Sequence, residues 1–310
     1  MNAHSPLPEV TFKASPEDFV VDEIDAYPAC SEGEHTFVRI RKRGLTTDGA
    51  ARAIAAALGI DGRAIGWAGM KDRHAVATQR LSLHGTSPEA VAAMPPIDGL
   101  EIVEVLRHKN KLKPGHLHGN RFTIRLHAVP EDAREAIDAG LAKIAERGAP
   151  NYFGPQRFGR DGDNAERALA FVRGETRPPR DARERRLLFS ALQSRWFNAV
   201  LAARVADDTF DVPQLGDLLQ KIPTGGLFTC EDVETDRARA QRFEISPTGP
   251  MFGVKMATPG EAIAARELET LAADAITSEQ LRAHRDLGEG TRRSLRLVVG
   301  DLHQEWGSPT

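Results

Sequence analysis

Short stretches in which apolar and polar residues alternate fill the first 130 residues of the chain. Residues 17–24 and 36–41 carry β-branched and aromatic side chains at near-alternating positions, which is typical of strands with one buried face. The same pattern predicts strands over 65–68, 79–83, 101–106 and 121–127. A helix capped by Thr47 and stopped by Gly59 interrupts them. Because no βαβ rhythm is present, the pattern predicts an α+β fold with a mixed or antiparallel sheet.

The later part of the chain has the longer periodicity of helices. Helices are expected over 131–147, 164–172 with Asn164 as cap, 184–205 and 259–273. Residues 224–228 and 246–253 are expected to form loops, and a last strand over 294–299 resembles the strands of the first part. Together these features favour a first domain made of residues 1–150 and 281–310, with a mainly helical domain, residues 151–280, inserted into it.

Composition excludes several classes of protein. The chain has 310 residues, enough for about two domains, and 41% of them are hydrophobic, yet no apolar run reaches the roughly 18 residues of a membrane span. Residues 1–8 lack the basic and apolar regions of a secretory signal. Two cysteines, Cys30 and Cys230, are too few for a disulfide framework or a cysteine zinc site. We therefore expect a cytoplasmic protein with no membrane contact.

The distribution of charge is more informative than the formal net charge of −3. Between Val105 and Pro130 there is no acidic residue. The basic residues of that stretch are Arg107, Lys109, Lys111, Lys113, Arg121 and Arg125, together with four histidines. Two further basic groups are Arg39, Arg41, Lys42 and Arg43, and Arg292, Arg293 and Arg296. The fold could gather these groups into one cationic surface, or they could be ordinary solvated faces.

The segment 66–79 contains the most unusual combination of side chains. An apolar strand leads into Gly69, and Lys71, Asp72, Arg73 and His74 follow in a row. A carboxylate among cations has a lowered pKa and stays ionised at neutral pH, as a nucleophile must. Asp72 is therefore a candidate catalytic residue. The alternative is a turn in which the aspartate caps its own backbone.

A second candidate segment, 107–122, combines basic residues and glycines with Asn120 and Phe122. Lysines and arginines bind phosphate, an amide can read a base edge, and an aromatic ring can stack on an unpaired base. Asn120 and Phe122 are two apart and share one strand face, although Phe122 could instead be a core residue. His116 and His118 could ligate a metal, but no Asp, Glu or Cys lies near them in the sequence.

A third segment, 150–159, contains three aromatic residues and two glycines. Such density predicts a tightly packed turn, either beneath a functional surface or as a folding element at a domain junction.

Four blocks of sequence, read in order, resemble the TruD family of tRNA pseudouridine synthases. The blocks are Pro16-Glu17-Asp18-Phe19, then residues 68–76 with Gln79, then Arg107-His108-Lys109 with Lys111-Leu112 and Gly119-Asn120-Arg121-Phe122, and Pro150-Asn151-Tyr152-Phe153-Gly154 with residues 156–159. They span most of the first 160 residues, and a weaker likeness continues through 249–253 to 289–293. Four blocks in register are far more specific than a single motif.

The resemblance implies isomerisation of uridine 13 of tRNA to pseudouridine, on a synthase domain interrupted by the family's inserted TRUD domain. It assigns the catalytic aspartate to Asp72 and the base-stacking ring to Phe122. The other substrate-binding positions that we expect are Phe19, Asn120, Lys71, Gln79 and Lys13, the last as a charge partner of the aspartate. The reaction adds nothing to the uridine and removes no electrons, so it requires no cofactor or metal. We expect tRNA as partner and a monomeric enzyme.

The chain departs from the family pattern at its C-terminus, because it stops at Ser308-Pro309-Thr310 without the family's last aromatic strand segment. Either the chain is truncated or its natural C-terminus differs. This departure suggests an alternative, a non-catalytic tRNA-binding protein of the same fold. A second alternative is a metal-dependent hydrolase that uses His108, His116, His118 and Asp72. A structural adaptor, the third, leaves the placement of Asp72, Asn120 and Phe122 unexplained.

Overall fold

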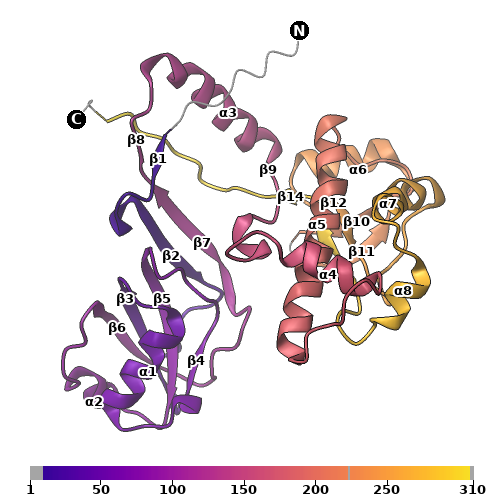
Figure 1. Cartoon of the computed structure of the whole chain (residues 1–310). Coiled ribbons are helices and arrows are strands. Elements are labelled where there is room, and N and C mark those ends of the chain that lie inside the picture. The colour runs from indigo at the N-terminus through magenta and orange to yellow at the C-terminus, as the bar shows by residue number, and fades with distance from the viewer. Residues whose placement is uncertain (1–9, 223, 308–310) are drawn as a thin grey trace. The chain divides into compact units, whose positions relative to one another are not determined.

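The computed structural model describes residues 10–222 and 224–307, and it divides the chain into two compact units, 1–134 and 135–310. Figure 1 labels the elements of both units. The expectations for residues 1–8 and 308–310 fall outside the described residues. The two-domain prediction placed residues 135–150 and 281–310 with the first part, whereas here they belong to the second unit. The functional assignment of the domains stays a prediction.

A mixed sheet forms the centre of the first unit. Its strands run in the order β6-β3-β5-β2-β7, with β4 paired to β5. Their bounds are β2 Phe19–Asp25, β3 His35–Lys42, β4 Ile65–Trp67, β5 Val76–His84, β6 Leu100–His108 and β7 Leu117–Ile124. β2 lies parallel to β5, and the other pairs are antiparallel. A small separate pair joins β1 Thr11–Phe12 to β8 Leu126–His127. The mixed sheet confirms the predicted α+β class.

Helix α1, Thr47–Leu58, covers one face of this sheet. Its Ile54 packs in one cluster with Val38, Ile40 and Leu81, which share that face. Thr46 rather than Thr47 is the N-cap, because the Thr46 hydroxyl accepts the amide hydrogen of Gly49. The helix ends at Gly59, whose φ of 65° needs a residue without a side chain. The short helix α2, Pro88–Ala92, adds Val91 to the same core.

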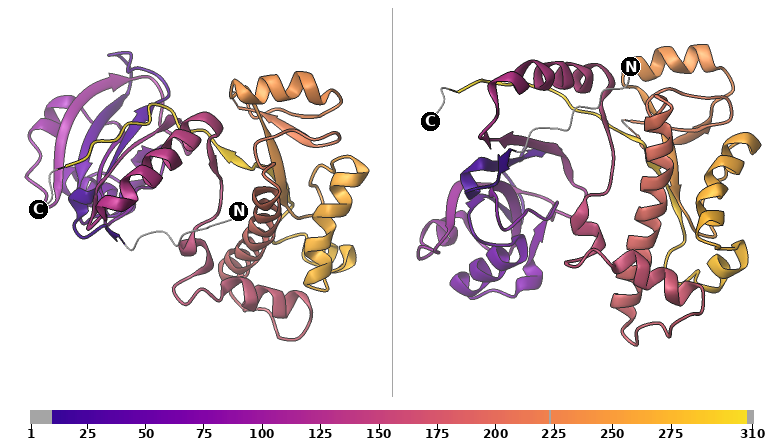
Figure 2. Two further views of the ribbon diagram at one scale, coloured as in Figure 1. Left: turned by 90° about the horizontal axis from the view of Figure 1, so that it is seen from above. Right: turned by 45° about the horizontal axis from the view of Figure 1, so that its top comes forward.

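Helices surround a four-stranded sheet in the second unit, and Figure 2 shows its longest helix, α5, running alongside that sheet. The helices are α3 Arg134–Arg147, α4 Asn164–Val172, α5 Ala182–Ala206, α6 Val233–Gln241, α7 Glu261–Ala273 and α8 Ser278–Ala283. The sheet order is β11-β10-β12-β13, from β10 Leu218–Lys221, β11 Leu227–Thr229, β12 Ile245–Met251 and β13 Thr291–Ser294. No helix in the described part of the chain combines the length and apolar character needed to cross a membrane.

The segment 246–253, which was expected to form a loop, is instead mostly strand. β12 lies between β10 and β13 and contains Pro247 and Pro250. A proline cannot donate to a ladder, but its carbonyl still accepts, and the carbonyl of Pro247 accepts from the amide of Leu295. The loop prediction was wrong, because these carbonyl groups keep the proline-containing segment in the sheet.

The last predicted strand, 294–299, also pairs differently from expectation. It splits into β13 and the two-residue β14, Arg296–Leu297. β13 pairs with β12, and β14 pairs with β9, Ala149–Pro150. All of these partners belong to the second unit, so this strand does not rejoin the sheet of the first.

The arginines at the end of the chain do not form a cationic surface. Arg292 is 5% exposed and forms a two-pronged ion pair with Glu267. Arg296 is 3% exposed and donates to the carbonyls of Ala240 and Ile245. Arg293 donates to Asn151, 2.6 Å away. These guanidinium groups hold loops and strands together inside the second unit.

Candidate active site

Asp72 lies in the loop between β4 and β5, where several contacts fix its position. Its Oδ1 accepts the backbone amide hydrogen of His74 at 2.9 Å, which is the turn contact that the sequence offered as the simpler explanation. Its Oδ2 is 3.1 Å from the ammonium of Lys13. The His74 amide first, and then Lys13, lower the pKa of Asp72 below its ordinary value. The carboxylate is therefore both a turn residue and an ionised group with a cationic partner.

Lys13 connects this carboxylate to an aromatic surface. Besides its ion pair with Asp72, its ammonium lies 3.8 Å from the centroid of the Phe19 ring. Its backbone has a φ of 58°, a left-handed conformation that costs energy for a residue with a side chain. Such strain is most often found at functional sites, and here it occurs at the residue that contacts both groups.

Phe19 and Phe122 form a stacked pair on adjacent strands. Their centroids are 6.0 Å apart with an angle of 18° between the ring planes. In the β2–β7 register Phe122 lies opposite Val21, so the two rings are diagonal neighbours on one sheet face. Phe122 is 55% exposed, which excludes the interpretation of this residue as a core aromatic.

Asn120 lies on the same face of β7 as Phe122, as the two-residue spacing predicted. It is paired in register with Glu23 of β2. Its side-chain oxygen is buried and accepts no hydrogen bond from the described residues. A buried polar atom without a partner is uncommon in folded proteins.

Lys71 and Gln79, two of the expected substrate-binding residues, lie inside the unit. The ammonium of Lys71 is 2.5 Å from Glu23, and the two side chains are only 4% and 2% exposed. Gln79 is fully buried and accepts a hydrogen bond from the Thr47 hydroxyl at 2.8 Å. The Thr47 hydroxyl in turn accepts the amide hydrogen of Lys71 at 2.9 Å. Both residues therefore support the segment that carries Asp72 rather than face solvent.

The structure adds Lys42 to this support, which the sequence analysis had counted only as surface charge. Lys42 is 1% exposed and donates to the backbone carbonyls of Leu45 at 2.7 Å and Asp72 at 2.9 Å. Burial lowers the pKa of Lys42 to about 8. Its position could have been inferred, because it falls on the same alternating face of the strand as Val38 and Ile40.

The histidines of the basic segment have structural partners. The His108 ring stacks on Phe37 with centroids 4.2 Å apart, and its Nδ1 accepts the amide hydrogen of Cys30. His116 is hydrogen bonded to the Tyr27 hydroxyl at 3.1 Å. Within the described residues, no three His, Cys, Asp or Glu side chains are grouped closely enough to hold a metal ion. The geometry therefore does not assemble the metal site of the hydrolase alternative.

The aromatic segment 150–159 is a folding element of the second unit. The side-chain amide of Asn198 donates to the Phe153 carbonyl and accepts from the Phe153 amide, both at 2.9 Å. The Phe153 ring packs edge-on against Phe197 and under Arg293. These contacts account for Phe153, whereas Tyr152 is 43% exposed.

Comparison with known proteins finds several relatives that all carry the same name. A family model described as tRNA pseudouridine synthase D (TruD) matches residues 4–177 and 181–308. The tRNA pseudouridine synthase D of an Anaeromyxobacter species is 47% identical over 298 residues, which cover 93% of this chain and 83% of that protein. The protein of the same name from Geobacter metallireducens is 37% identical over 354 aligned positions, which cover 94% and 87%.

A solved structure shares the fold. A crystal structure named for tRNA pseudouridine synthase D of Methanosarcina mazei superimposes with a TM-score of 0.76 and covers 93% of this chain and 84% of that one. At 20% identity this likeness concerns the fold alone. It agrees with the mixed helix and sheet architecture described above.

Proposed function

This chain belongs to the TruD family of tRNA pseudouridine synthases, and from that premise we propose that it isomerises uridine 13 of tRNA, with Asp72 as the catalytic aspartate. The observation that carries the proposal is the position of Lys13. Its ammonium contacts both the carboxylate of Asp72 and the ring of Phe19, which in turn stacks on the exposed Phe122. One cation thus joins an ionised carboxylate to a surface suited to a nucleobase.

The substrate uridine must leave the RNA stack before any side chain can reach its ribose. Phe122 provides an exposed ring on which the flipped base stacks, and such stacking offsets about 1–3 kcal/mol of the cost. The unpartnered oxygen of Asn120 lies on the same strand face and accepts a hydrogen bond from the base. Phe19 supports the Phe122 ring from the neighbouring strand.

Asp72 then acts on the ribose, by attack at C1′ or by removal of the C2′ proton. The bond between N1 and C1′ breaks, the uracil turns, and C5 forms a new bond to C1′. On the first route this new bond displaces the Asp72 oxygen from C1′, and on the second the proton that Asp72 took returns to C2′. C5 loses its proton and the released N1 gains one, so atoms and electrons balance without a cofactor or a metal. Lys13 holds Asp72 ionised for this step, and Lys42, Lys71 and Gln79 position the segment that carries it. A monomeric state and a cytoplasmic location stay predictions.

Release of tritium from tRNA transcripts labelled at uridine C5 tests the reaction directly, because the new bond expels that hydrogen. We expect release by the wild type and a loss of at least about a thousandfold in Asp72→Asn. Asp61→Asn is a matched control, because Asp61 also accepts an amide hydrogen two residues ahead, from Arg63, in an exposed turn. A transcript with cytidine in place of uridine 13 should contain no pseudouridine at position 13 after the reaction.

Three outcomes contradict parts of the proposal. Release by Asp72→Asn at the wild-type rate removes Asp72 from the centre of the reaction. Release from a transcript without uridine 13 shows that the position is wrong. Tight tRNA binding with no release by the wild type favours the non-catalytic alternative.

A further inference from the structure

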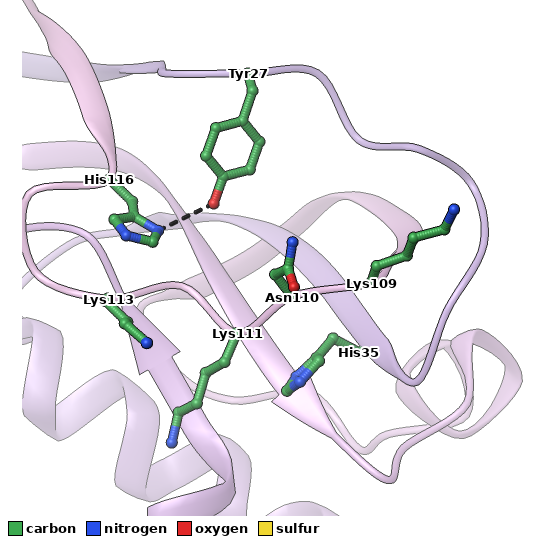
Figure 3. Close-up of a pocket in the computed structure, with 7 residues that line it drawn as sticks. All are labelled: Tyr27, His35, Lys109, Asn110, Lys111, Lys113 and His116. Carbon is green, nitrogen blue, oxygen red and sulfur yellow. Dashed lines mark hydrogen bonds between the residues drawn. The ribbon is translucent and has the colours of Figure 1, made fainter.

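A basic pocket lies in the first unit, in a part of the sheet region that the proposed reaction does not use. It has a volume of about 420 Å³ and is lined by Tyr27, His35, Lys109, Asn110, Lys111, Lys113 and His116. Figure 3 shows these side chains around a common space, with Lys113 and His116 on one side and His35 and Asn110 on the other. A volume of this size is in the range of small-ligand sites and exceeds what a single ion fills.

One polar atom in the pocket has no partner. His35 is only 9% exposed, and its Nδ1 is buried without a hydrogen bond to any described residue. Burial, and then the charges of His84 and Lys111, lower the pKa of His35, so its ring is neutral at neutral pH. A neutral imidazole donates from one ring nitrogen and accepts at the other, so Nδ1 of His35 is a hydrogen-bonding group without a protein partner.

The cations of the pocket differ in how far they are already engaged. Lys109 forms an ion pair with Glu32 at 2.5 Å, and Lys111 donates to the Arg63 carbonyl at 2.6 Å. The side chain of Lys113 is exposed and has no ion pair or hydrogen bond with the described residues, although its backbone carbonyl accepts from the amide of His116. Lys111 keeps two further N–H groups after its one bond. The pocket therefore has ammonium donors to spare, and two carboxylates lie near it: Glu32, paired with Lys109, and Glu34, close to His35.

We propose that this pocket binds a phosphate-bearing nucleotide of the RNA substrate, with Lys113, Lys111 and His35 as the donors to the phosphate. The inference rests on the proposed function, because it assumes that the bound partner is tRNA. Basic side chains that line one pocket match a phosphate group, which offers only acceptor oxygens. The size of the pocket leaves room for the attached sugar.

The position of the pocket shows which nucleotide this is not. His116 immediately precedes β7, and Phe122 lies six residues further on, about 20 Å at the usual rise of a strand. The pocket therefore holds a nucleotide other than the one whose base stacks on Phe122. The amide of Gly115 donates to the carbonyl of Ala68 at 2.9 Å, which ties this loop to the segment that leads to Asp72. RNA bound here acts as an anchor for the substrate while the chemistry proceeds elsewhere.

The affinity for a tRNA transcript, measured at several NaCl concentrations, tests the inference. Lys113→Gln should weaken binding roughly three- to tenfold at low salt and reduce the salt slope by about one, because one counterion-releasing contact is lost. Lys143→Gln is the matched control, since it removes an exposed lysine from helix α3 of the other unit. It should leave both quantities unchanged.

His35→Phe separates hydrogen bonding from charge. It keeps a planar ring but removes the unpartnered nitrogen, so tRNA binding should weaken about threefold or more with the salt slope unaltered, because a neutral donor releases no counterion. Thermal unfolding of the variant shows whether the fold is intact. In steady-state kinetics, Lys113→Gln should raise KM for tRNA and leave kcat unchanged, because the pocket lies away from Asp72.

Four results are decisive. Equal affinity and salt slope in Lys113→Gln and Lys143→Gln overturn the inference. The inference is also overturned if uridine monophosphate binds the wild type but not Lys113→Gln while the two proteins bind tRNA equally well. That result would show a site for a free nucleotide. If Lys113→Gln binds tRNA more weakly but the wild type releases no tritium, the pocket binds RNA and the proposed reaction is wrong. If the wild type releases tritium and Lys113→Gln binds tRNA as tightly as the wild type, the proposed reaction is supported and the pocket is not an RNA site.

Discussion

The rings of Phe19 and Phe122 lie 6.0 Å apart and nearly parallel, although their residues are separated by most of the first unit in sequence. Phe19 is partly covered, whereas Phe122 is 55% exposed. The pair therefore presents one supported aromatic face to solvent. In a core the second face would be filled by protein, and its exposure here is what suits the ring to a base from outside.

Removal of the exposed ring should affect catalysis far more than stability. We expect Phe122→Ala to lower kcat/KM for tRNA by about 10- to 100-fold, the equivalent of one lost base stack. The free energy of unfolding should change by less than about 1 kcal/mol, because little of the side chain is buried. Urea unfolding and tritium release measure the two effects.

Ile124→Ala is the control for this variant, because Ile124 lies on the same face of β7 and is 51% exposed. It removes similar apolar surface but no aromatic ring. A loss of activity as large as that of Phe122→Ala would show that general packing, not stacking, is responsible.

The charge of Lys13 should determine the acid limit of activity. A carboxylate with a lowered pKa is active above that pKa and loses activity as pH falls through it. Lys13→Gln removes a cation that lowers the pKa of Asp72, so the acid limb of the kcat/KM profile should move to higher pH. Lys13→Arg keeps the charge and should move the limb less. An unshifted limb in Lys13→Gln means that Asp72 is not the group that titrates.

Lys42 should make the stability of the protein rise with pH. Its pKa is about 8 when folded and 10.5 when unfolded, so the unfolded chain binds more protons between these values. Compared with Lys42→Met, the wild type should gain up to about 3 kcal/mol of unfolding free energy from pH 8 to 10.5. Below pH 8 the difference between the two proteins should be constant.

Urea unfolding across this pH range measures the difference. Lys255→Met, which removes an exposed lysine paired with Glu289, should show no such slope against the wild type. Parallel curves for the wild type and Lys42→Met would contradict the lowered pKa. In the activity assay Lys42→Met should also lose turnover, because the Asp72 carbonyl loses its donor.

The buried ion pair between Lys71 and Glu23 should be costly to break from one side. Lys71→Met leaves a carboxylate that is 2% exposed without its cation, and we expect a loss of about 3–5 kcal/mol in unfolding free energy. The double variant Lys71→Met/Glu23→Gln should recover part of this loss, because the amide is uncharged and its oxygen still accepts from the Arg80 backbone.

A double-mutant cycle from urea unfolding gives the coupling between the two residues. Equal losses in the single variant Lys71→Met and the double variant would mean that the uncompensated charge is not the source of the cost.

Sequence patterns predicted the parts of the site that depend on strand alternation. Asn120 and Phe122 share a face because they are two apart, and Asp72 forms the turn contact expected of an aspartate after Gly69. Alternation also places Lys42 on the buried face of its strand, but local patterns do not show that the other buried basic residues are buried. In the sequence, nothing distinguishes Lys71, Arg292 and Arg296 from surface cations. In the structure, acidic and carbonyl partners from distant segments surround them. Their partners come from tertiary packing, which local spacing does not encode.

The pairing of β2 with β7 has a consequence for the growing chain. Val21 is 101 positions from Phe122, its partner in the register. On its other side β2 pairs with β5, which is also later in the sequence. During synthesis the first of these strands leaves the ribosome long before either neighbour exists, and contacts of such long sequence separation are formed slowly. A nascent chain that ends before residue 122 lacks one ring of the Phe19–Phe122 pair, so the aromatic face that we propose for the uridine forms in one late step rather than by degrees.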